Sequence, residues 1–111
     1  MYDYISIHSV KFASFIKTDE IEKFFVLKLK CRKLCALIFT KELGKSSITI
    51  RGIHADPQGN YGYDSSDVLN EINLIEIDIP ENIDISVETE IMKFAKKISK
   101  EFLWEIDLGD R

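Results

Sequence analysis

Two histidines and two cysteines are the residues of this sequence best suited to acid–base, metal or redox chemistry. His8 and His54 are the only histidines, and Cys31 and Cys35 are the only cysteines. A pair of histidines can act as general acid and base if the fold brings the rings together. Neither histidine has zinc-ligand spacing to the cysteines or to the other histidine. We therefore expect no metal site, and the histidine pair stays open as an alternative.

The common catalytic signatures do not occur in the sequence. It has no glycine-rich phosphate loop, no Gly-x-Ser-x-Gly, no His-Glu-x-x-His and no Cys-x-x-Cys. The Asp-Ser-Ser-Asp of residues 64–67 lacks the ligand register and closing glutamate of a calcium loop, so helix capping is its simpler role. Both cysteines are expected to be reduced, buried structural thiols. The sequence thus favours a protein that is not an enzyme and needs no cofactor.

Charge is distributed unevenly along the chain. Residues 1–53 contain 10 Lys and Arg against 5 Asp and Glu, whereas residues 54–111 contain 5 against 14. From His54 to Met92, 39 residues include ten carboxylates but no Lys or Arg. Such an acidic surface would speed the encounter with a cationic partner. The simpler alternative is a solvated face, partly neutralised by the basic first half of the chain.

A stripe of cations between residues 24 and 33 supports the opposite interpretation, nucleic-acid binding. On a strand, Lys28, Lys30 and Arg32 would share one face, with Lys33 beside them, and phosphate groups need such cations. However, aromatic residues do not alternate with these cations, and the net charge is −4. We therefore expect no nucleic-acid partner.

Apolar residues at every second position predict the strands that would position these groups. The predicted strands cover residues 2–8, 10–17, 24–32, 34–39, 47–53 and 72–79. Residues 24–32 could instead continue a helix that begins at Thr18 or Asp19, but a helix would scatter the three cations, so the strand is favoured. Residues 34–39 are apolar on both faces, as in a covered central strand.

A C-terminal helix is the clearest predicted element. Asp84 or Ser86 can cap this helix, which ends near Leu103 or Trp104. Its apolar residues recur at intervals of three and four. The tail beyond it either forms a short strand or frays. Together these elements predict one α+β domain over residues 1–111, a mainly antiparallel sheet of five or six strands with the C-terminal helix packed on one face.

Residues 54–70 show no periodic pattern and are rich in turn formers. A connection of this length is unusual in a compact domain, so it is either functional or contains a short helix around residues 66–71. It places Tyr61 and Tyr63 beside Asp56, Asp64 and Asp67 in the sequence, and tyrosines among carboxylates are typical of interfaces with basic proteins. This connection is therefore the main candidate binding region.

The chain carries no long apolar segment. Its longest uninterrupted apolar run is Leu34 to Phe39, which is far short of the roughly 20 residues that cross a bilayer. Its first residues do not show a basic region followed by an apolar stretch, as a secretory signal would. We expect a cytoplasmic protein with no membrane partner.

A small acidic domain with no catalytic set and an acidic connection that carries tyrosines resembles the bacterial immunity proteins that neutralise toxin domains, including those of contact-dependent growth inhibition systems. The resemblance is one of type and rests on no signature motif. It implies a protein that binds a cognate toxin domain, often a basic nuclease, and covers its active site with acidic groups. The candidate partner-binding residues are Asp56, Tyr61, Tyr63, Asp64, Asp67, Glu71, Glu76 and Asp78.

A structural or assembly subunit is the alternative from another class. Such a protein would form a homodimer through the sheet edges, or through an apolar sheet face that a single helix leaves uncovered. The apolar run from Leu34 to Phe39 motivates this alternative. A stable homodimer in solution would favour assembly, whereas a monomer would favour the inhibitor.

Overall fold

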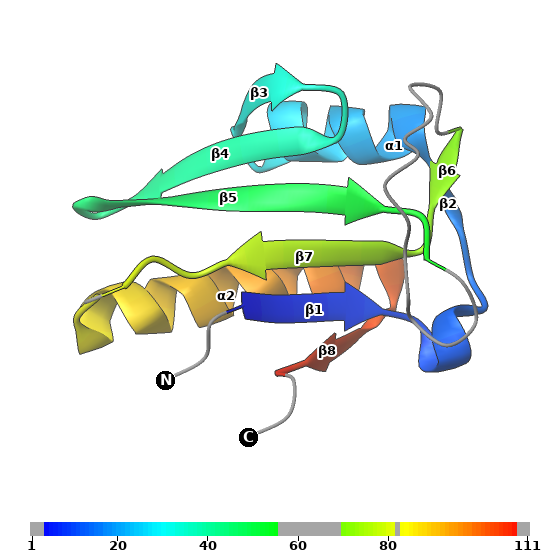
Figure 1. The fold of residues 1–111 in the computed structure, drawn as a ribbon. Coiled ribbons are helices and arrows are strands. Elements are labelled where there is room, and N and C mark those ends of the chain that lie inside the picture. The colour runs from blue at the N-terminus through cyan, green and yellow to red at the C-terminus, as the bar shows by residue number, and fades with distance from the viewer. Residues whose placement is uncertain (1–3, 56–69, 82, 109–111) are drawn as a thin grey trace.

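A six-stranded antiparallel sheet, with helices on one side, dominates the computed structural model, which describes residues 4–55, 70–81 and 83–108 (Figure 1). Within these residues the strand order is β3-β4-β5-β7-β1-β8, and β2 and β6 form a separate pair. The strands are β1 (Tyr4–His8), β2 (Ile16–Lys17), β3 (Arg32–Cys35), β4 (Ile38–Leu43), β5 (Ser46–Ile53), β6 (Glu71–Ile72), β7 (Leu74–Asp78) and β8 (Glu105–Asp107). The helices are the 3₁₀ helix η1 (Val10–Phe12), α1 (Thr18–Lys23), the π-helix η2 (Phe24–Lys28) and α2 (Ile85–Phe102). The predicted α+β class is confirmed.

The hydrophobic core lies on one face of the sheet. Strand register aligns Phe39, Ile50, Ile77 and Ile5 in one row across β4, β5, β7 and β1, and all four side chains are at most 1% exposed. The α2 helix lies behind this face in Figure 1. Its buried stripe completes the core and consists of Val87, Ile91, Phe94, Ala95 and Ile98. The apolar face of the strands and the apolar stripe of α2 therefore pack against each other, as the sequence predicted.

The predicted strand over residues 24–32 is wrong, and the helical alternative that begins at Thr18 is the observed one. A strand would send Phe24 and Phe25 to opposite faces, yet both rings are buried. The Phe25 ring stacks on Phe39 of β4 with 5.0 Å between centroids and lies 6.5 Å from Phe94 of α2. The packing of these rings favours the helix, although the residues that follow them alternate as they would in a strand.

Two further predicted strands are interrupted by turns. Residues 34–39 are divided between β3 and β4, and Leu37, in the turn between them, has a φ of 62° and is buried. β3 is an edge strand and not a covered central one, and its residue Leu34 is 54% exposed. Residues 10–17 contain η1 and the two-residue β2 instead of one strand. The ladders of β5 and β7 agree with the strands predicted over residues 47–53 and 72–79, except that β6 and β7 are separate.

The α2 helix begins as predicted, with Asp84 as its N-cap. The Asp84 Oδ1 atom accepts hydrogen bonds from Ser86 Oγ at 2.6 Å and from the Val87 N–H at 3.0 Å. These bonds, the one from Ser86 first, lower the pKa of Asp84 below its ordinary value of 3.8. The helix ends at Phe102, Leu103 follows in a left-handed conformation, and the tail forms β8 beside β1. None of the helices in the described residues is long and apolar enough to span a membrane.

Changing Asp84 to Asn should test the charge contribution of this cap, since Asn keeps an acceptor but loses the charge. The folded state lowers the pKa of Asp84, so the ionised carboxylate stabilises the fold above pH 3.8, and this contribution disappears as pH falls through the folded-state pKa. In urea unfolding, the native protein should be more stable than Asp84→Asn at about pH 7, with the difference closing at about pH 2. An equal difference at both pH values would contradict the charge contribution.

Candidate functional site

The face of the sheet opposite the helices is mainly polar. The α1, η2 and α2 helices share the core face, whereas η1 adjoins the other face at the end of β1, where Phe12 stacks on His8 (Figure 1). Strand register arranges rows of side chains there, and we call this surface the open face. The two long rows contain, in order, Arg32, Thr40, Thr49, Asp78 and Tyr4, and Cys35, Ile38, Arg51, Glu76, Ser6 and Asp107. A third row contains Ile53, Leu74, His8 and Glu105, and Glu42 pairs with Ser47 at the end of the β4–β5 hairpin.

Charge changes sign across the open face. The cations Arg32 and Arg51 lie on β3 and β5, with Glu42 on β4 between them, whereas the four carboxylates Glu76, Asp78, Glu105 and Asp107 lie on β7 and β8. The guanidinium of Arg51 donates to the Asp78 carboxylate and forms an ion pair with it. We call the part of the open face on β7, β1 and β8 its acidic end.

Tyr4 stands at this acidic end. It is the cross-strand neighbour of Asp78, and 41% of its surface is exposed. A tyrosine on a strand has only two rotatable side-chain bonds, so its ring can fill a pocket of a partner at a low entropy cost. The acidic end therefore combines an aromatic anchor with carboxylates that the strands hold in place.

His8 closes the acidic end at the last residue of β1. Its Nδ1–H donates to the Ser9 carbonyl at 2.7 Å, which directs Nε2 towards Asp107 Oδ2 at 3.4 Å. The ring also stacks on Phe12 with 4.0 Å between centroids. The contact of His8 with Asp107 links the last residue of β1 to the last residue of β8.

His54 lies in a different environment from His8. Its Nδ1 atom is 3.2 Å from the Glu71 carbonyl, and its ring is tilted against Phe15. The hydrogen bonds and ring contacts of the two histidines thus involve different residues. Within the part of the chain that the structure describes, no group of three or more His, Cys, Asp or Glu is arranged to hold a metal ion.

Asn73 fixes the point where the chain leaves the sheet after β5. Its side chain is buried, its Oδ1 atom accepts from the Ala55 N–H at 2.7 Å, and its Nδ2 atom donates to the Ala55 carbonyl at 2.9 Å. Nδ2 also donates to the Phe12 carbonyl at 3.2 Å. A buried amide with these partners satisfies its hydrogen-bonding groups and ties two segments together.

The eight candidate residues from the sequence divide into three groups. Five of them lie outside the described residues: Asp56, Tyr61, Tyr63, Asp64 and Asp67. Glu76 and Asp78 lie together on β7 and face outwards on the open face. Glu71 belongs to the separate β2–β6 pair, opposite Lys17, and does not join the two long rows.

Three further residues of the open face were missed from the sequence: Tyr4, Arg51 and Asp107. The alternation of Tyr4 with the buried Ile5 was a usable signal for an outward side chain. The placement of Asp107 beside Ser6 gives no local signal, because it depends on β8 returning to pair with β1.

The basic stripe considered for residues 28–33 is not formed. Lys28 lies in η2, with its Nζ atom 4.0 Å from Glu101 Oε2, and the Lys33 Nζ atom is 3.0 Å from Glu22 Oε2. Only Arg32 of this group belongs to the open face. Because residues 24–28 are helical, these cations do not form one row on a sheet face, as they would on a strand.

The two thiols differ in environment, and only one prediction for them is confirmed. Cys31 is buried as predicted, and desolvation raises its pKa to about 11 against an opposing effect of Lys41. Cys35 was also predicted to be buried, but it is exposed because β3 lies at the sheet edge.

Alkylation with iodoacetamide should therefore distinguish the thiols. The thiolate is the reactive form, so the native protein should gain one adduct, at Cys35, and a second at Cys31 only in denaturant. Peptide mass spectrometry over time measures both rates, and Cys35→Ser provides the control that should stay unmodified while folded. Equal rates at both positions in the native protein would contradict the burial of Cys31.

The open face is the most distinctive surface of the described residues that the strands position. Its acidic end carries one exposed tyrosine and four carboxylates on the sheet. Comparisons of this chain with protein-family models, with curated proteins and with solved structures find no match.

Proposed function

We propose that this protein is an immunity protein that binds a cognate toxin domain and inhibits it through the acidic end of the open face. The observation that carries the proposal is the array of Glu76, Asp78 and Asp107 around Tyr4. Its partner is a basic protein domain, with a nuclease as the favoured class. The role requires no catalytic group or cofactor in this chain, and it implies a location in the bacterial cytoplasm.

The sheet geometry suits recognition of a cationic surface. Glu76 and Asp78 alternate along β7, so their Cα atoms are about 7 Å apart, whereas Asp107 is two strands from Glu76, about 10 Å away. Because the strands fix these positions, little backbone entropy is lost when a partner binds. A nuclease contacts phosphates through Lys and Arg, and such carboxylates would occupy the same cations.

The ion pair between Arg51 and Asp78 gives the acidic end a means of selecting its partner. Both side chains are partly exposed, so the pair contributes little to stability. An arginine of the partner can compete for the Asp78 carboxylate, while Arg51 repels a cation that is placed out of register. This combination of attraction and repulsion favours one orientation of the bound domain.

The connection between β5 and β6 supplies the remaining candidates. Its sequence contains Asp56, Tyr61, Tyr63, Asp64 and Asp67. Asn73 holds Ala55 where this connection begins, and the Thr18 N–H donates to the Asn70 carbonyl at 2.9 Å near its other end. In the proposal, these residues and Glu71 extend the contact beyond the open face.

A homodimer formed through a sheet edge is the second candidate. Leu34, on edge strand β3, is 54% exposed and favours this function. The version based on an apolar uncovered face has lost its basis, because the run from Leu34 to Phe39 is two strands and the open face carries charges. A mass that doubles with concentration in sedimentation equilibrium would favour the homodimer.

Charge reversal at Glu76 and Asp107 should weaken the proposed inhibition. A variant with Glu76→Lys and Asp107→Lys should bind its partner about a hundredfold less tightly, since two close charge pairs become repulsive. The matched control reverses Glu20 and Glu101, two exposed carboxylates on the helices, and should bind like the native protein.

The experiment begins with affinity capture from the native lysate and identification of the captured protein by mass spectrometry. The purified partner is then assayed for toxic or nuclease activity with each variant, and circular dichroism verifies folding. Equal inhibition by the native protein and the open-face variant, or capture of nothing but the protein itself, would argue against the proposal.

A further inference from the structure

Two adjacent hollows lie beside the outer part of β4, with volumes of about 340 and 520 Å³. Lys30, Lys41 and Glu42 line both hollows, which we together call the basic groove. Its charged lining residues come from five segments and are Lys28, Lys30, Arg32, Lys41, Lys93, Lys97, Glu42 and Glu90. Six cations and two carboxylates give the lining a charge of +4 in a chain whose net charge is −4.

The edge of β4 between the hollows has no neighbouring strand within the described residues. The β3–β4 ladder ends at the pair Arg32 and Thr40, although β4 continues beside β5 to Leu43. Alternate residues of an antiparallel strand turn their amide groups to the same side, so Glu42 directs its backbone N–H and C=O outwards, as Thr40 does. An added chain can therefore pair with Glu42.

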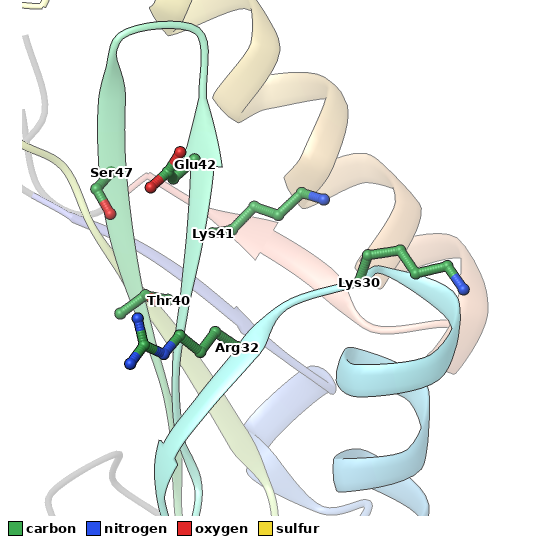
Figure 2. A pocket seen from close by; sticks show the side chains of 6 residues that line it. All are labelled: Lys30, Arg32, Thr40, Lys41, Glu42 and Ser47. Atoms are coloured by element: carbon green, nitrogen blue, oxygen red, sulfur yellow. The ribbon is translucent and has the colours of Figure 1, made fainter.

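Lys30 is the reason that β3 does not occupy this position. It would lie opposite Glu42 if the ladder continued, but its φ of 58° turns the chain away towards η2. Figure 2 shows the resulting divergence of β3 from the β4–β5 hairpin. A left-handed conformation is strained for a lysine, whereas a glycine adopts it readily.

The cations of the basic groove do not converge on one point. In Figure 2, the Lys30 and Arg32 side chains point to opposite sides, and Lys41 extends towards the helices. The Lys41 Nζ atom donates to the Leu29 carbonyl at 2.8 Å, which fixes this ammonium at the end of η2. A row of separated cations matches a chain of separated negative charges better than it matches a single phosphate.

The lining also distinguishes a peptide from a nucleic acid. Single-stranded nucleic acids are typically held by exposed aromatic faces on which bases stack. Phe94 is the aromatic residue of this lining, and it is only 5% exposed. The unpaired amide groups of Glu42 are instead suited to a peptide backbone.

We propose that the basic groove binds an extended acidic peptide segment of another protein, which adds to the sheet beside Glu42. Side chains of an added strand alternate between its two faces, so acidic residues of the segment enter both hollows. One hollow offers Arg32 and the other offers Lys93 and Lys97. This site lies at the β3–β4 side of the sheet, away from the acidic end, and its test does not involve the proposed toxin.

Fluorescence anisotropy with a labelled peptide of about ten residues, in which pairs of glutamates alternate with pairs of valines so that both faces of an added strand carry carboxylates, measures this binding. Lys97→Glu should weaken the affinity about fivefold because it reverses one cation of the groove. Lys96→Glu makes the same charge change at the neighbouring exposed residue of α2, which does not line the groove, and should keep the native affinity. Equal effects of the two substitutions, or no binding of the peptide at low ionic strength, would overturn the proposal.

Lys30→Gly separates binding from folding. Glycine accepts the left-handed conformation, so this variant should melt at a higher temperature than the native protein while it binds the peptide about threefold more weakly. An unchanged affinity would overturn the proposed role of Lys30 in the groove.

Two competing occupants are tested in the same way. A thymidine oligonucleotide that binds more tightly than the acidic peptide would overturn the proposal in favour of a nucleic acid. Self-association in sedimentation equilibrium that Lys97→Glu abolishes would overturn it in favour of a second copy of this chain. A monomer that prefers the acidic peptide over both the oligonucleotide and a lysine-substituted peptide supports it.

Discussion

The Phe25 ring links three elements on which the remaining architecture depends. It contacts Phe39 of β4 and Phe94 of α2, so one aromatic cluster joins η2, the sheet and α2. Because this cluster holds η2 and α2 on the same side, the opposite side of the strands carries charged and polar residues. The open face is thus a consequence of how the core is packed.

The elements that sequence patterns predicted well are those whose pattern and packing agree. In β5, β7 and α2, each period matches one buried face, and Asp84 is a recognisable cap. The errors at residues 10–17 and 34–39 share a physical cause. The chain bends at Lys11, Phe12 and Leu37 with positive φ, a conformation that glycine usually signals. Without glycine or proline at these bends, an uninterrupted strand was the natural prediction.

The candidate site was predictable only where one strand determines it. Alternation along β7 correctly turned Glu76 and Asp78 outwards, but their neighbours Tyr4 and Asp107 come from the two ends of the chain. The strand order β7-β1-β8 follows from long-range pairing, which a local pattern does not encode. Similarly, the basic groove joins Lys28 and Lys30 to lysines of α2 because a helix, and not a strand, contains residue 28.

The two charged regions lie towards opposite edges of one sheet. The basic groove adjoins β3 and β4, whereas the acidic end belongs to β7, β1 and β8. Neighbouring strands are about 4.8 Å apart, so the sheet spans roughly 24 Å from β3 to β8. Opposite charges separated over that length contribute an electric dipole along the width of the sheet. An approaching cationic protein would experience a torque that turns the acidic end towards it before contact, so orientation begins during diffusion.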